Sequence, residues 1–233
     1  MIFLFLFIQP VIAVEGFDAS ELLEKCIHYH DPDGQWAQLK TSLFMTETRP
    51  NGSVGKVHLE VDLGADRFVY RGSSDNRVIV RKWENQSCHT SIDGSSEFSE
   101  ADAEKYKLNC DTVKWYKDYY NYLWGFPMNL AEGSLEPSAR KVDFMGRSVL
   151  ELRVVYRPPV GTDVWLFYLD PTTHALVGCR FYKKGKVDSG EYITFEDEYK
   201  IGTMRLPKTR SWYTNVEDKL LGTDSLIGHQ LQD

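Results

Sequence analysis

Short stretches of alternating apolar and polar residues, separated by turn signals, recur along most of this sequence and constrain its fold. In residues 57–63 every second residue is apolar, and the residues between are His58, Glu60 and Asp62. Residues 36–47 show a similar strand-like pattern. Successive side chains of a strand point to opposite faces, so this period predicts antiparallel strands with one buried and one polar face. Turn signals about every 8 to 12 residues are typical of a β sandwich or barrel.

Two stretches break this pattern and predict helices. Residues 18–21, Asp-Ala-Ser-Glu, fit a capping box, and apolar residues follow at helical spacing as far as His30. A polar segment, residues 87–109, precedes the second helix. We expect Asp111 to cap this helix, which should run over residues 112–123.

These elements together predict a fold class. A long antiparallel sheet twists and curls, and its concave face has to be covered. We therefore expect a mainly β (α+β) fold, in which a single strongly curved antiparallel sheet, or an incomplete β barrel, is covered by the N-terminal helix and a mid-chain helical insert. Because no break in composition marks a linker, residues 14–233 are expected to form one domain.

The N-terminal residues 1–13, MIFLFLFIQPVIA, carry no charge and predict a signal peptide. The run is too short to cross a bilayer, and Val11 and Ala13 fit the small-residue positions of a cleavage site. No Lys or Arg precedes the run, and an uncleaved buried strand is the alternative interpretation. We expect an exported protein, periplasmic or extracellular, without a transmembrane span elsewhere.

The chain has 4 cysteines, and an even number permits disulfides in an exported protein. Cys88 and Cys110 lie on either side of the polar segment and are the favoured pair, although other pairings remain possible. Cys26 and Cys179 lie in apolar patterns and are expected to be small buried residues.

Several classes of binding site find no support in the sequence. The net charge of -7 argues against nucleic-acid binding, which needs a basic surface. His28 and His30 would point apart on a helix, so a packed or capping histidine is favoured over a metal ligand. The sequence contains no CxxC pair, Walker loop or G-x-G-x-x-G motif. We therefore expect no metal, no cofactor and no nucleic-acid partner.

Catalytic motifs are equally weak, and we predict no catalytic residues. Ser74-Asp-Asn and Ser138-x-x-Lys match two β-lactamase elements, but they occur in the reverse of the order that this class requires. Glu196 and Glu198 share one strand face, which is not the arrangement of two carboxyl groups across a glycosidase cleft. A hydrolase with a site assembled from dispersed polar residues is the less favoured alternative.

Aromatic side chains, 13% of the chain, are the feature that remains. Residues 115–124, WYKDYYNYLW, are more aromatic than a surface helix needs, so we expect them to cover an apolar face as a lid. A cavity beneath this lid could hold an acyl chain, but closed packing of helix and sheet explains the pattern equally well. The predicted ligand-binding residues are Phe68, Tyr70, Trp83, Trp115, Tyr119, Leu123, Trp124, Trp165, Phe167 and Phe181.

The order of the elements resembles the periplasmic lipoprotein carriers of the Lol type, which form an incomplete β barrel covered by helices. The turn Asp170-Pro-Thr-Thr between two apolar strands is similar to a late hairpin of those proteins. Four motifs resemble more closely an uncharacterised family of exported Bacteroidota proteins: Tyr29-His-Asp-Pro, Tyr122-Leu-Trp-Gly-Phe-Pro, Asp170-Pro-Thr-Thr and Gly222-Thr-Asp. This resemblance implies export from a Gram-negative cell and brings no established activity.

The favoured function is the non-catalytic binding or carriage of an apolar ligand, a lipid or a lipoprotein acyl chain, in the cell envelope. The alternative is an envelope protein-interaction module, in which an outer sheet face or edge recruits a protein partner. The two hypotheses differ in whether a cavity lies beneath residues 112–123.

Overall fold

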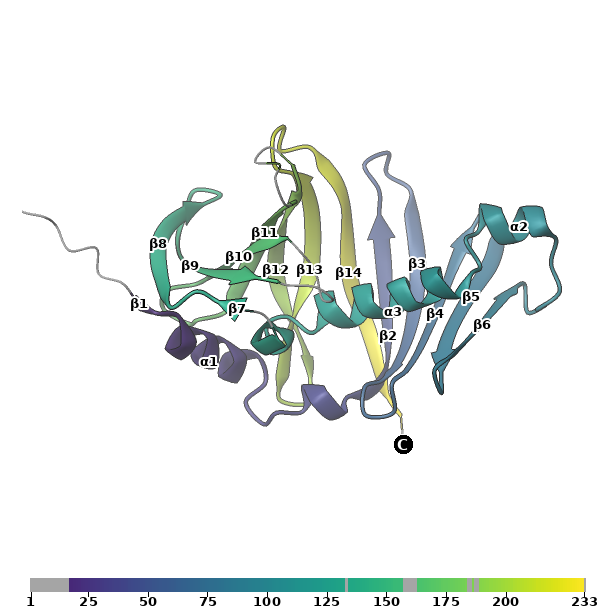
Figure 1. The fold of residues 1–233 in the computed structure, drawn as a ribbon, viewed down its shortest axis with the longest axis horizontal. Coiled ribbons are helices and arrows are strands. Elements are labelled where there is room, and N and C mark those ends of the chain that lie inside the picture. The colour runs from purple at the N-terminus through teal and green to yellow at the C-terminus, as the bar shows by residue number, and fades with distance from the viewer. Residues whose placement is uncertain (1–16, 133, 157–162, 184–185, 187–188, 233) are drawn as a thin grey trace, which may run out of the picture.

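The structure, a computed structural model, describes residues 17–132, 134–156, 163–183, 186 and 189–232. The predicted signal peptide, residues 1–13, lies outside these ranges. Figure 1 shows the strands side by side in one curved sheet, with helix α3 lying across them. No helix in the described ranges is both long enough and apolar enough to span a bilayer.

The fold is mainly β and consists of one large antiparallel sheet that does not close into a barrel, which confirms the predicted fold class. Its 14 strands follow the order β1-β8-β9-β10-β11-β12-β13-β14-β2-β3-β4-β5-β6, and β7 pairs with β9 beside this path. The strands are β1 (Phe17–Asp18), β2 (Lys40–Thr48), β3 (Val54–Asp62), β4 (Arg67–Ser74), β5 (Arg77–Glu84), β6 (Ser87–Ile92), β7 (Ser134–Leu135), β8 (Ser138–Phe144), β9 (Arg147–Val155), β10 (Val164–Leu169), β11 (Leu176–Tyr182), β12 (Glu191–Ile201), β13 (Met204–Thr214) and β14 (Leu220–Leu231).

Two runs of sequential hairpins, β2 to β6 and β8 to β14, make up almost the whole sheet. They are joined by the pairing of β14 with β2, in which Asp224 lies opposite Glu47 and Leu226 opposite Met45. The last strand of the chain therefore lies in the middle of the sheet, and side chains distant in sequence become neighbours on its concave face.

The helices are α1 (Ala19–His30), α2 (Glu100–Lys105) and α3 (Cys110–Trp124), with 3-10 helices η1 (Trp36–Gln38) and η2 (Met128–Glu132). As predicted, Asp18 caps α1 by accepting the N–H of Glu21 at 2.9 Å. The cap of α3 is Asn109, so the prediction of Asp111 was wrong by two positions. The expected strand over residues 36–47 also begins late, because the Asp31 carboxylate accepts two backbone N–H groups and winds η1 first.

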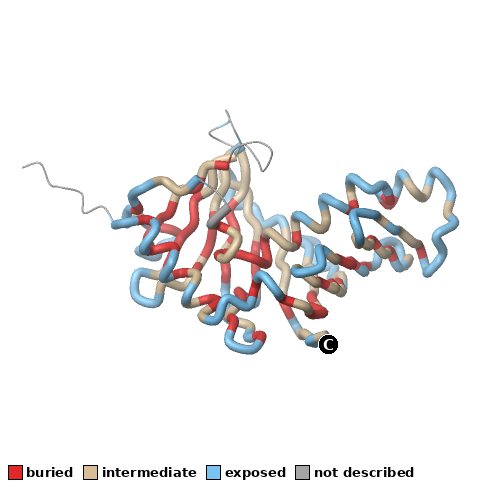
Figure 2. The backbone as a smooth tube through the Cα atoms, turned by 60° about the horizontal axis from the view of Figure 1, so that its bottom comes forward, coloured by how far each residue is buried: buried red, intermediate tan, exposed pale blue. Residues whose placement is uncertain are grey.

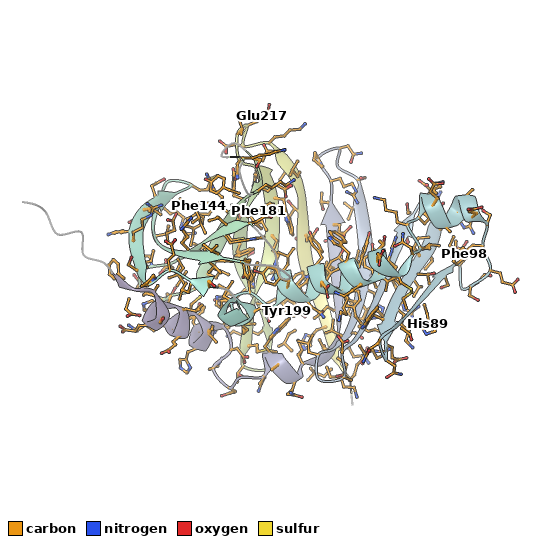
Figure 3. The ribbon with its side chains drawn as sticks, viewed as in Figure 1. His89, Phe98, Phe144, Phe181, Tyr199 and Glu217 are labelled. Carbon is orange, nitrogen blue, oxygen red and sulfur yellow. A yellow bond between two sulfur atoms is a disulfide. The ribbon has the colours of Figure 1, made fainter. Side chains whose placement is uncertain are left out.

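The hydrophobic core is divided along the sheet. One cluster joins α1 and the C-terminal end of α3 to strands β8 to β12 and includes Leu22, Cys26, Leu123, Phe126 and Phe167. A second cluster lies between α3 and strands β2 to β4, β13 and β14. Figure 2 shows buried residues concentrated along the sheet, whereas α2 is largely exposed. Figure 3 places Phe144, from a smaller cluster, near one end of the sheet and Phe98 near the other.

Candidate functional site: the cavity beside helix α3

Helix α3 is the element that organises the site. The Asn109 side-chain oxygen accepts the N–H of Thr112 at 2.8 Å, which satisfies one free donor of the first turn. The buried face of α3 carries Val113, Tyr120, Leu123 and Trp124. A disulfide joins Cys110, the first residue of α3, to Cys88 of β6, with 5.5 Å between the Cα atoms. This is the pair that the sequence favoured, and it ties the start of the helix to the edge strand.

An open cavity of about 1030 Å³ lies alongside α3. Its wall is formed by parts of α1, η1, the turn after β3, α3, η2 and the facing ends of β9 and β10. The wall is mainly apolar, and its volume is at the upper end of the range of about 300–1,000 Å³ for small-molecule sites. Its apolar and aromatic lining residues are Ile27, Trp36, Ala37, Leu63, Trp115, Tyr119, Tyr122, Met128, Tyr156 and Trp165.

The aromatic rings of this wall support one another. Trp115 stacks on Tyr119 one helical turn later, with ring centroids 4.9 Å apart. Tyr122 packs edge-to-face against Trp165 at 6.0 Å, and its hydroxyl is hydrogen-bonded to that of Tyr156. Offset and edge-to-face pairs of this kind each stabilise by about 0.5–1.5 kcal/mol beyond the area that they bury. These contacts connect α3 to β10 and to Tyr156, and they order the rings of the wall.

Three of the ten predicted ligand-binding residues line this cavity: Trp115, Tyr119 and Trp165. Phe181 lies directly behind the wall, since its ring stacks on Trp165 at 4.7 Å. Lining residues that the sequence analysis missed include Tyr122, which belongs to the predicted aromatic segment. Ile27, Leu63 and Met128 come from three other parts of the chain, and no sequence pattern connects them.

The other six predicted residues do not line the cavity. Leu123 and Phe167 are buried in the cluster that contains α1, and Phe68, Tyr70 and Trp124 are buried in the second cluster. Trp83 packs against this second cluster and donates its Nε1–H to Asp66 at 3.0 Å. For the strand residues among them the sequence could not exclude the cavity, because a period of two shows the face of the sheet but not the distance from a cavity.

A row of charged side chains crosses the concave face beneath α3. Arg210 of β13 lies opposite Asp224 of β14, which in turn lies opposite Glu47 of β2. The guanidinium of Arg210 stacks on the Trp124 ring of α3, with 3.4 Å between Cζ and the ring centroid. The Tyr120 hydroxyl of α3 donates to Glu47 at 2.7 Å. The helix therefore rests on charged groups as well as on apolar ones.

Burial shifts the pKa values of two groups in this row. Burial lowers the pKa of the Arg210 guanidinium to about 9, which leaves it charged at neutral pH. Burial, together with repulsion from Glu47, raises the pKa of the Asp224 carboxyl to about 7. Near neutral pH a large share of Asp224 is therefore protonated.

His30, the last residue of α1, is a packing residue, as the sequence favoured. Its Nε2 accepts the N–H of Leu176 at 2.9 Å, so the ring proton lies on Nδ1, which faces the Arg205 carbonyl at 2.5 Å. Burial lowers the pKa of His30. The imidazole thus joins the end of α1 to β11 and β13.

The two free cysteines and the possible metal ligands of the described ranges form no reactive site. Burial raises the pKa of the Cys26 and Cys179 thiols, and both cysteines are free and buried. Within the described ranges, no group of three His, Cys, Asp or Glu side chains could hold a metal ion.

The open sheet with helices on its concave side has a LolA-like fold. A LolA superfamily protein from Nitrosomonas europaea superposes with a TM-score of 0.53 at 10% identity, covering 93% of this chain and 94% of that chain. A domain from Vibrio parahaemolyticus described as an outer membrane lipoprotein-sorting protein gives a TM-score of 0.56 at 12% identity, covering 92% and 94%. The chain belongs to the family of unknown function DUF6503, whose model matches residues 1–229. A search of curated proteins finds no match.

Proposed function

We propose that this protein is a non-catalytic binding or carrier protein for an apolar ligand, such as a lipid or a lipoprotein acyl chain, in the cell envelope. The observation that carries the proposal is the aromatic-walled cavity of about 1030 Å³ beside α3. Each methylene group moved from water into such a site contributes about 0.8 kcal/mol, so a chain of ten carbons could bind without any directed contact. The LolA-like fold supports the same function, because one similar structure is described as a lipoprotein-sorting protein.

We also propose that residues 1–13 are a signal peptide and that residues 14–233 form one domain, exported to the periplasm or beyond. The cysteine pair Cys88–Cys110 supports this location, because disulfides persist in oxidising compartments. An origin in a Gram-negative bacterium, and in Bacteroidota in particular, remains a prediction from the sequence motifs.

The proposal is tested by titrating the purified protein with the apolar dye 1-N-phenylnaphthylamine and by mass spectrometry of the lipids that copurify with it. Trp165→Glu places a charge in the cavity wall and is expected to weaken dye binding at least tenfold. Trp83→Glu is the matched control, because Trp83 is also a half-buried strand tryptophan but lies outside the cavity. Its dye affinity should change less than twofold.

Thermal unfolding of both variants separates misfolding from loss of the site, and Leu63→Glu repeats the test from another element of the wall. A wild-type protein that binds no dye and carries no lipid would refute the carrier function. Equal effects of the two tryptophan variants would show that the dye does not bind in this cavity.

A further inference from the structure

Arg210 is the most unusual buried group of the described chain. It is 1% exposed and has the largest side chain among the fully buried residues. Its Nη1 donates to the Pro207 carbonyl at 2.9 Å, but its Nε and Nη2 have no hydrogen-bond partner among the described residues. None of the ion pairs within 4.0 Å in the described ranges includes Arg210.

Such a group is costly for folding. A buried charge needs a counter-charge and acceptors for its N–H groups, and an apolar residue of similar volume in its place is often neutral or stabilising. Stacking on Trp124 compensates only part of the desolvation. Local departures of this kind from good packing are found where function requires them.

The acidic groups that face Arg210 leave its Nε and Nη2 without a hydrogen-bond acceptor. Glu47 accepts the Tyr120 hydroxyl at 2.7 Å and lies 3.9 Å from Arg49. Asp224, on the strand next to Arg210, forms no ion pair with it within 4.0 Å. Because burial raises the pKa of Asp224 to about 7, its protonated form can donate a hydrogen bond to an anion beside Arg210.

Arg210 lies where the two large core clusters meet, close to the cavity wall. Its guanidinium is over Trp124 of one cluster and 5.6 Å from the ring centroid of Phe195 of the other. Tyr119 packs against both clusters, lines the cavity and interacts electrostatically with Arg210 and Asp224. Tyr119 therefore connects the cavity wall to the surroundings of the buried cation.

We propose that Arg210 is a head-group site, and that the cargo is an amphiphile whose anionic carboxylate or phosphate binds Arg210 while its tail occupies the cavity. This inference rests on the proposed carrier function and adds the chemistry of the polar end. The head reaches the guanidinium when Tyr119 moves out of the wall. An anion there would accept hydrogen bonds from Nε and Nη2, in the forked geometry for which arginine is suited.

The test compares ligands that share a tail and differ in the head. Dissociation constants for oleate, oleyl phosphate and uncharged oleyl alcohol are measured by calorimetry on the full chain, below their aggregation concentrations. The wild type should bind at least one of the two anions ten times more tightly than the alcohol, and the two anionic ligands distinguish a carboxylate from a phosphate head. In Arg210→Met this preference should fall to about one, while the affinity for the alcohol changes less than threefold.

Arg205→Met is the matched control, since Arg205 belongs to the same strand but donates to the Tyr29 carbonyl at 2.9 Å. It should keep the full preference for the anion. If Arg210→Met does not fold, Arg210→Lys, which keeps the charge, should retain a measurable preference.

A wild type that binds the alcohol and the anions equally overturns the head-group site and leaves the carrier function intact. Parallel weakening of all ligands by Arg210→Met also overturns it, because Arg210 would then only support the wall. A wild type that binds none of the three refutes both proposals.

Discussion

Helices α1 and α3 cover the same sheet, yet they are held in different ways. Both are amphipathic and both begin at a side-chain cap, Asp18 or Asn109. At its C-terminal end α1 is joined to the sheet by directional polar contacts: His30 bonds two strands, and Arg205 donates to the Tyr29 carbonyl. Helix α3 also makes polar contacts, from Tyr120 to Glu47 and from Tyr122 to Tyr156, but these are between side chains. The rest of its attachment is aromatic packing, a stacked guanidinium and a disulfide at its first residue.

The difference teaches how one concave face can combine a fixed element with a movable one. Hydrogen bonds to buried backbone groups define a single position, because any shift leaves them unsatisfied. Hydrophobic burial is non-directional, so the apolar packing of α3 tolerates small shifts better than buried hydrogen bonds do. We therefore expect α1 to be the rigid element and α3 the one that moves to admit a ligand. The predictions below test this contrast, from the largest expected effect to the smallest.

The disulfide should have the largest effect on global stability, and its local effect should be confined to α3. Closing a loop with a sequence separation of 22 residues stabilises by about 3 kcal/mol in the chain-entropy model. Cys88→Ala combined with Cys110→Ala should lower the free energy of unfolding by that amount in urea titrations. Amide hydrogen exchange that proceeds by local opening should become faster in α3 and stay unchanged in α1. The reduced wild type provides the control and should match the double variant. Equal acceleration in both helices would contradict the contrast between them.

Loss of His30 should be the next largest effect, this time at α1. His30→Ala leaves the Leu176 N–H and the Arg205 carbonyl without their side-chain partner, at a cost of about 2 kcal/mol. His28→Ala is the matched control on the same helix, because His28 is exposed and its loss should cost less than about 0.5 kcal/mol. Urea unfolding measures both. Indistinguishable stabilities for the two variants would show that α1 is not fixed by this histidine.

Much of this contrast could be predicted from sequence because it is local. The Asp18 cap, the aromatic character of residues 115–124 and the cysteine pair flanking the polar segment are all features of short range. The alternation that defined the strands also depends only on neighbouring residues. The curvature followed from the physics of long antiparallel sheets.

The charged row could not be predicted, because it depends on strand pairing. Arg210, Asp224 and Glu47 become neighbours only when β14 pairs with β2, a contact between opposite ends of the chain. The same limit applies to the aromatic residues. Trp165 and Phe167 are two residues apart on one face of β10, but only Trp165 reaches the cavity wall.

The pH dependence of stability should have opposite signs for His30, at the end of α1, and for Asp224, on β14 beneath α3. Burial lowers the pKa of folded His30 below 6.5, so its contribution is present above pH 6.5 and is lost as the pH falls below that value. Asp224 has a raised pKa, so its contribution is present below pH 3.8 and is lost as the pH rises towards about 7. For Asp224 we expect an effect of about 1 kcal/mol, because this residue is only partly buried and solvent screens its charge.

Differences between variants separate these two contributions. The stability of wild type minus that of Asp224→Asn should decrease from pH 4 to pH 7, whereas wild type minus His30→Ala should increase between pH 5 and pH 7. Urea titrations at each pH provide both curves. Slopes of the same sign would show that one of the two protonation states is assigned wrongly.

The smallest effect on stability should come from Trp115, at the exposed end of the lid. This residue is 57% exposed and touches chiefly Tyr116 and Tyr119 of its own helix, so Trp115→Ala should lower the free energy of unfolding by only about 0.5 kcal/mol, the low end of the range for an aromatic pair. The same variant should weaken dye binding about threefold, because Trp115 lines the cavity. A helix that only packs would respond in the opposite way, with stability lost and binding unchanged. That pattern would mean that α3 is as fixed as α1, and that the cavity is reached without movement of the helix.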